Sequence, residues 1–122
     1  MSGMSVAVDL AALADRVAEF GDRAYLVTVG DDGPHVVSVQ VSLSDGHLGL
    51  RVGRGTAANL TARPAATVLW PPGPGGEYSL IVDGEAVAPV ELGPVRVRPT
   101  TAVLHRVAGT GDGPACLPVD GT

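Results

Sequence analysis

A strict alternation of apolar and polar residues runs through positions 37–43 and resumes, after a short turn, at positions 48–52. Since successive side chains of a β-strand point to opposite faces, this period of two predicts two strands that each bury one face. The turn between them, Ser44-Asp45-Gly46-His47, contains an Asp-Gly pair of the kind that closes tight hairpins. The chain is therefore expected to contain an antiparallel hairpin, which excludes an all-helical fold. The apolar positions of this pattern are Val37, Val39, Val41, Leu43, Leu48, Leu50 and Val52.

Further segments rich in β-branched and apolar residues bring the predicted number of strands to six. Asp83-Gly84 is interpreted as a bulge or bend in the fifth strand, and Pro99 confines the sixth to an edge or a kink. Short strands with hairpin connections and no βαβ repeat predict a mostly β fold, a small antiparallel barrel with short helices. The six predicted strands cover residues 25–29, 36–43, 48–52, 66–70, 78–87 and 95–107.

Two short helices complete the predicted fold. Apolar residues recur at helical spacing over residues 9–20, with Asp9 as a candidate cap and Gly21 as the expected stop. Thr56 is expected to cap a second short helix, which ends before Pro64.

The chain is interpreted as one domain over residues 1–107, followed by a flexible tail over residues 108–122. The tail is rich in Gly, Pro and Thr and contains the single cysteine, Cys116, for which no role is assigned.

Charge and composition narrow the possible functions. The chain has 13 acidic and 8 basic residues, all of the latter arginine, and only 3% aromatic residues. Nucleic-acid binders carry a basic stripe and stacking aromatics, so no nucleic-acid partner is expected. The absence of a long apolar run and of a basic leader followed by an apolar segment predicts a cytoplasmic protein with no membrane partner. One cysteine and three scattered histidines predict no metal site, and no residue is assigned as catalytic.

The strongest candidate binding segment covers residues 51–60, which leave a strand and enter the second helix. Free backbone N–H groups at a helix start attract anions, and Gly53 and Gly55 let a ligand approach the backbone closely. The Arg54 guanidinium could form two parallel hydrogen bonds with a phosphate, and the Thr56 hydroxyl could cap the helix or donate to phosphate. The residues alone leave open the alternative of a capped loop with solvated arginines.

The order of these features resembles the pyridoxamine 5'-phosphate oxidase-like family of flavin-binding split β-barrels. The resemblance covers residues 24–107 and includes an Asn-Leu-x-x-x-Pro pattern, here Asn59, Leu60 and Pro64. It implies a six-stranded split barrel that forms a homodimer. FMN, or the deazaflavin F420 in some relatives, would lie in a groove at the dimer interface. Many members carry basic residues at the positions of Gly55 and Thr56, and here the nearest basic residue is Arg54.

The resemblance also implies which residues contact the cofactor. Ser38, Val39 and Gln40 would run beside the ring, and Trp70 would line the substrate side or pack at the dimer interface. The residues expected on the phosphate side are Arg51, Gly53, Arg54, Thr56 and Asn59.

The implied function is an FMN- or F420-dependent oxidoreductase acting on a small-molecule substrate. FMN is favoured because a polyglutamylated F420 tail would prefer a basic groove and this chain is acidic. The displaced basic residue keeps a second hypothesis open: a non-catalytic dimeric split barrel that has lost its cofactor or binds another ligand such as haem.

Overall fold

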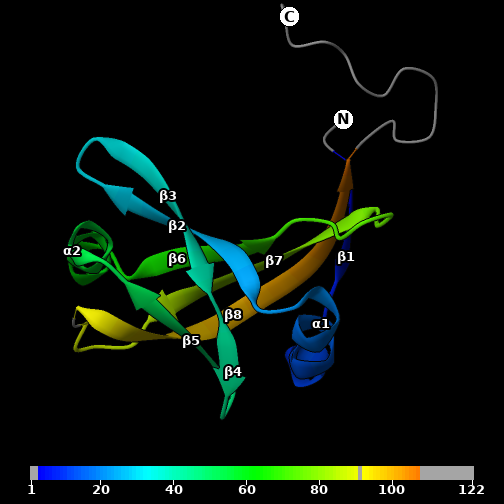
Figure 1. Cartoon of the computed structure of the whole chain (residues 1–122), viewed down its shortest axis with the longest axis horizontal. Helices are drawn as coiled ribbons and strands as arrows, with labels where there is room; N and C mark the ends of the chain where they lie inside the picture. Colours follow the sequence, from blue (N-terminus) through cyan, green and yellow to red (C-terminus); the bar gives the residue numbers. More distant parts are fainter. Residues whose placement is uncertain (1–2, 91, 108–122) are drawn as a thin grey trace, which may run out of the picture.

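A computed structural model describes residues 3–90 and 92–107 as a curled antiparallel sheet with two helices (Figure 1). This architecture confirms the predicted mostly β split-barrel fold. The tail over residues 108–122, with Cys116, lies outside the described residues. The helical elements are the 3-10 turn η1 (Leu10–Ala12), α1 (Leu13–Phe20) and α2 (Arg54–Ala62). The strands are β1 (Gly3–Ala7), β2 (Arg23–Gly30), β3 (Gly33–Gln40), β4 (Ser42–Ser44), β5 (His47–Val52), β6 (Ala65–Trp70), β7 (Tyr78–Ala86) and β8 (Gly93–Val107).

The barrel closes through a bend at Val41. The strands follow the order β3-β2-β6-β7-β8-β5-β4, so β3 and β4, adjacent in sequence, lie at opposite ends of the sheet. The Val41 N–H donates to the Asp22 carbonyl at 2.7 Å, and pairing with β5 begins at the next residue, where Ser42 faces Gly49. The single strand predicted over residues 36–43 is therefore two strands with different partners. If β3 and β4 are counted as one bent strand, they form with β2, β5, β6, β7 and β8 the six predicted strands.

The strand β1 was not predicted, and it pairs with the far half of β8 from Gly3↔Val107 to Ala7↔Val103. The near half of β8 pairs with β5 on the same side, up to Leu48↔Val97. Pro99 lies in the gap between these two partners, where no ladder bond is needed, in agreement with its predicted edge position.

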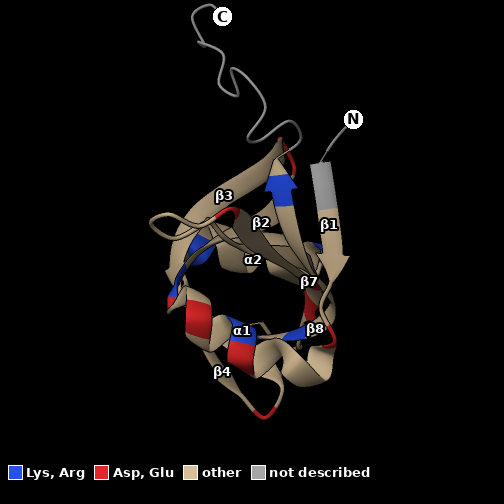
Figure 2. Ribbon diagram, turned by 90° about the vertical axis from the view of Figure 1, so that its right-hand side faces the viewer, with Lys and Arg blue, Asp and Glu red and all other residues tan. Residues whose placement is uncertain are grey.

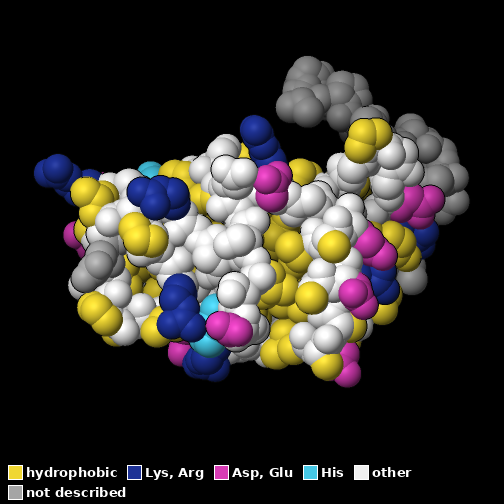
Figure 3. Space-filling view, turned by 60° about the horizontal axis from the view of Figure 1, so that its bottom comes forward, with side chains coloured by type: hydrophobic (Ala, Val, Ile, Leu, Met, Phe, Trp, Pro, Cys, Tyr) yellow, Lys and Arg dark blue, Asp and Glu magenta, His cyan; other side chains and the backbone are white. Residues whose placement is uncertain are grey.

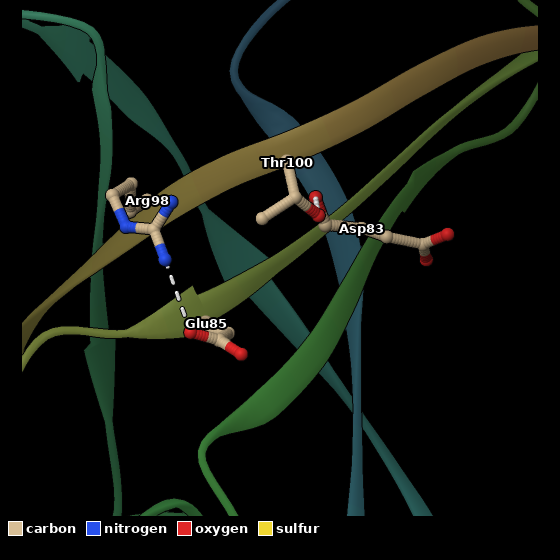
Figure 4. Close-up of polar contacts among 4 residues, drawn as sticks. All are labelled: Asp83, Glu85, Arg98 and Thr100. Atoms are coloured by element: carbon tan, nitrogen blue, oxygen red, sulfur yellow. Dashed lines mark hydrogen bonds and ion pairs between the residues drawn. The ribbon is translucent and has the colours of Figure 1, made fainter.

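The irregularity predicted at Asp83-Gly84 is a shift of register between β7 and β8. A Cβ atom at Gly84 would collide with the carbonyl oxygen of Arg98, so only glycine fits there. Around the bulge, Thr100 Oγ1 donates to the Asp83 carbonyl at 3.1 Å, and the Arg98 guanidinium pairs with the Glu85 carboxylate at 3.0 Å (Figure 4). The Asp83 carboxylate also accepts a hydrogen bond from Thr67 Oγ1 at 2.6 Å. The carboxylates of Asp83 and Glu85 are therefore both bonded to neighbouring strands.

The inward side chains of the sheet and one face of α1 form a single core. The helix lies across one end of the curled sheet (Figure 2), where it buries Leu13 and Val17. The helical segment is capped by Asp9, whose carboxylate accepts from the Ala11 N–H at 3.0 Å, and it ends at Gly21 with a φ of 93°. The largest fully buried side chains are Trp70, Leu26, Leu48, Leu60, Leu80, Val68, Val82, Val97 and Thr28.

Candidate functional site

Two adjoining hollows form a groove along the β3–β4 bend. The first has a volume of about 480 Å³ and the second of about 670 Å³, and Gln40 lines both. The outward residues of β3 that were predicted to contact a cofactor, Ser38 and Gln40, lie on this groove with Val39 between them. The Gln40 amide donates to the Asp22 carboxylate at 2.9 Å, which fixes its position at the junction. We refer to these two hollows together as the β3–β4 groove.

Unpaired arginines gather at the β3–β4 groove. Of the eight arginines in the chain, Arg16, Arg63, Arg98 and Arg106 pair with carboxylates. The guanidinium groups of the other four make no ion pair or hydrogen bond to any residue in the described part of the chain. Three of them line the groove and the fourth begins α2. These four are Arg23, Arg51, Arg54 and Arg96.

The placement of two of these arginines follows from the register of β5 and β8. Arg51 faces Pro94 and Arg96 faces Gly49, so the two arginines are diagonal neighbours on one face of the ladder. Such neighbours lie about 7–8 Å apart, where two like charges repel each other unless an anion lies between them. In Figure 3 arginines gather on the half of the face that carries β5 and α2 with some carboxylates among them, and a further group of carboxylates lies towards α1. The net charge of −5 therefore does not describe the charge of the groove.

The corner between β5 and α2 is open. The helix begins at Arg54 with Gly53 as its N-cap, and no side chain caps it. A Cβ atom built on Gly53 or Gly55 would meet nothing within 4 Å, and Gly53, Arg54 and Gly55 are all exposed, so this side of the first turn is open to solvent. The expectation that Thr56 caps this helix is wrong, because the helix begins earlier and Thr56 lies inside its first turn, 4% exposed.

Asn59 positions α2 and does not line either hollow. Its side-chain Nδ2 donates to Oγ1 of the buried Thr28 on β2 at 3.2 Å. The absence of a side chain at Gly30 makes room for this contact, since a Cβ there would lie 3.0 Å from Asn59 Oδ1. The residue thus holds the helix, and with it the open corner, against the barrel.

Trp70 lies in the core and does not face a ligand or a partner surface. The side chain is 0% exposed, and its Nε1 donates to the Gly21 carbonyl at 2.9 Å. Both roles expected from the sequence, lining the substrate side and packing at an interface, are therefore wrong for this residue. The next residue, Pro71, takes the position at the groove.

Neither a metal cluster nor a membrane span is found in the parts of the chain that the structure describes. Residues 3–90 and 92–107 bring together no group of three His, Cys, Asp or Glu side chains that could hold a metal ion. None of their helices has the length and apolar content needed to cross a bilayer.

The fold resembles that of known split barrels. The structure is similar to an FAD-binding protein from Mycobacterium smegmatis, with a TM-score of 0.64, 18% identity and coverage of 84% of this chain and 98% of that one. It is also similar to an FAD-binding protein from Mesorhizobium loti, with a TM-score of 0.64, 17% identity and coverage of 84% of this chain and 97% of that one. For an F420 reductase the TM-score is 0.57 and the identity 20%, with coverage of 66% of this chain and 87% of that one. The fold is that of the pyridoxamine 5'-phosphate oxidase-like split barrels, which confirms the resemblance seen in the sequence.

Two proteins, from Mycobacterium bovis and Mycobacterium tuberculosis and each described as an uncharacterized protein, are 41% identical to this chain. The similarity covers 83% of this chain and 82% of each relative. The chain belongs to the same family as these two mycobacterial proteins, a family with the pyridoxamine 5'-phosphate oxidase-like split-barrel fold. No family model matches the sequence.

Proposed function

We propose that the protein is a flavin- or deazaflavin-dependent oxidoreductase whose cofactor lies in the β3–β4 groove. The observation that carries this proposal is the group of unpaired arginines beside the open start of α2. Flavin nucleotides and F420 join a negatively charged phosphate to a flat tricyclic ring. The groove offers arginines near the corner between β5 and α2 for the phosphate, and the strand β3 for the ring. The names of the similar structures, two FAD-binding proteins and an F420 reductase, support the same class.

The residues of the groove fit such a cofactor. Arg51, Arg54 and Arg96, with the N–H groups after Gly53, would hold the phosphate, and the strand around Gln40 would run beside the ring. When bound, the cofactor supplies the hydride or electron chemistry, and the chain binds it, orients it and excludes water from it. Because the acidic residues lie mainly elsewhere, net charge no longer favours FMN, and the proposal includes FMN, FAD and F420. A cytoplasmic location stays a prediction from the sequence.

Titration of the purified protein with FMN, FAD and F420 tests this proposal. At least one of them is expected to lose fluorescence on binding, and its absorption bands are expected to shift. Riboflavin has the same ring as FMN without the phosphate, so it should bind at least about tenfold more weakly, since the charge-assisted hydrogen bonds are lost. A protein that responds to none of the three at tens of micromolar would support a barrel without such a cofactor.

We also propose that a second copy of the chain covers the outer face of the sheet. Tyr25, Leu69, Ile81 and Val103 face one another across β2, β6, β7 and β8. They form an outward apolar row, in which Tyr25 is 42% exposed. Further exposed valines on β2 and β3 extend this row, and such patches are typical of interfaces. Because Tyr25 also lines the β3–β4 groove, the second copy would supply the other wall of the site.

Light scattering tests the dimer. The protein is expected to have twice its chain mass of 12.3 kDa, and Ile81→Glu is expected to shift it to a monomer because it places a charge in the apolar row. Ala18→Glu adds the same charge to the exposed side of α1 and should leave the dimer intact. Circular dichroism shows whether both variants fold. A wild-type chain that is monomeric at all concentrations would contradict the proposal.

A further inference from the structure

Arg23 is an unpaired cation at the end of the β3–β4 groove away from α2. It is exposed on the outer face of β2, directly opposite Gln40 of β3. The adjacent Asp22 does not neutralise it, because the Asp22 carboxylate accepts the Gln40 amide and lines the other hollow. No carboxylate in the described part of the chain pairs with the Arg23 guanidinium. This end of the groove therefore carries an exposed cation that no carboxylate in the described part of the chain neutralises.

The surroundings of Arg23 match a flat ring that carries an acid. Tyr25 lies two residues further along the same face of β2, about 7 Å away along the strand, and presents an exposed aromatic ring. Ser38 faces Tyr25 across the ladder, and Pro71 completes the hollow of about 480 Å³. An aromatic face, an apolar wall and a guanidinium at this spacing are the groups that bind an aromatic carboxylate.

The cofactor phosphate does not account for this cation. Arg51 and Arg96 line the second hollow, beyond Gln40, and Arg54 begins α2. A phosphate held by those three arginines leaves Arg23 at the opposite end of the groove.

We propose that Arg23 and Tyr25 hold the substrate, and that the substrate is a planar organic acid whose carboxylate pairs with Arg23. This inference depends on the proposed function, since it places the cofactor phosphate at the other end of the groove.

Titration with benzoate and its uncharged analogue benzamide tests the inference. Calorimetry is carried out on the wild-type protein with and without bound FMN. With FMN bound, benzoate is expected to bind about fivefold more tightly than benzamide, the size of a solvent-exposed charge pair. Arg23→Gln should remove this preference and change the FMN affinity by less than about twofold, and Arg23→Lys should keep part of it. Arg63→Gln is the matched control, because Arg63 is also exposed, pairs with Asp31 at 3.1 Å and lines neither hollow.

The outcomes separate this inference from the proposed function. Equal binding of benzoate and benzamide by the FMN-loaded wild type overturns the inference while the cofactor proposal stands. The inference is also overturned if Arg23→Gln keeps the preference for benzoate over benzamide. It is likewise overturned if that variant loses as much affinity for FMN as it loses for benzoate. If none of FMN, FAD and F420 binds, the proposed function fails. The Arg23 site is then supported if Arg23→Gln lowers the benzoate preference of the FMN-free protein and overturned if it does not.

Discussion

Replacement of both Arg51 and Arg54 with alanine is expected to weaken FMN binding by about 100-fold and riboflavin binding by less than about twofold. Both side chains are exposed and unpaired at the corner between β5 and α2, so their removal deletes charge without disturbing the core. Riboflavin lacks the phosphate that these guanidinium groups would contact, and therefore it reports on the ring alone. Fluorescence titration of the two ligands against wild type and variant measures the difference.

A second double variant controls for the loss of positive charge. Arg16→Ala with Arg63→Ala removes the same charge from two arginines that already pair with carboxylates at 3.1 Å. It should leave the affinities for both ligands near those of the wild type. If the Arg51 and Arg54 variant lost FMN and riboflavin equally, the corner would not be the phosphate site. The single variant Arg54→Ala is expected to bind FMN about tenfold more weakly than the wild type, because it loses one charge-assisted contact.

Trp70→Ala is expected to lower the free energy of unfolding by about 3–5 kcal/mol, the cost of removing a large aromatic side chain from a packed core. Trp70 is fully buried, and its Nε1 also satisfies the Gly21 carbonyl at the end of α1. Trp70→Phe keeps most of the apolar volume and loses the hydrogen bond, so it is expected to cost about 1–2 kcal/mol. Urea unfolding followed by circular dichroism measures both, since the substitutions remove the tryptophan fluorescence.

Leu92→Ala is the control for these core variants. Leu92 is 59% exposed and lies outside the proposed dimer face, so its truncation should change stability by less than about 0.5 kcal/mol. A Trp70→Ala protein as stable as the wild type would contradict the burial of the indole ring. Comparing stability with cofactor affinity also distinguishes the two possible roles of Trp70, because a residue that contacted the ligand would change the affinity more than the stability.

The sequence predicted those parts of the fold that leave a local signal. The alternation through Val39 and Leu50, the Asp-Gly turn and the bulge at Gly84 each depend on neighbours in sequence. The break at Val41 left no such signal, because the alternation continues through the bend while the pairing partner changes from β2 to β5. The strand β1 was missed because Gly3–Ala7 has little β-branched content and depends on β8 for its pairing.

The candidate site was predictable in part for the same reason. The open corner follows from Gly53, Arg54 and Gly55, which are adjacent in sequence. Arg96 was missed because only the register of β5 and β8 brings it beside Arg51. Asn59 and Trp70 were assigned to the ligand from the family resemblance, whereas in the structure Asn59 Nδ2 donates to Thr28 and Trp70 Nε1 donates to Gly21. A resemblance in sequence alone does not show whether the partner of a polar or aromatic side chain is a ligand or the protein.

The hydrogen bonds that close the barrel at the β3–β4 bend include those of the β4–β5 pairing, over three cross-strand pairs, and the bond from the Val41 N–H to the Asp22 carbonyl. One wall of the groove belongs to β3 and the other to β5, so the groove crosses the seam of the barrel. A molecule that touches both walls would bridge this seam. Occupancy and resistance to unfolding are then thermodynamically linked, and a tightly bound molecule raises the melting temperature of the whole domain in proportion to the logarithm of its concentration.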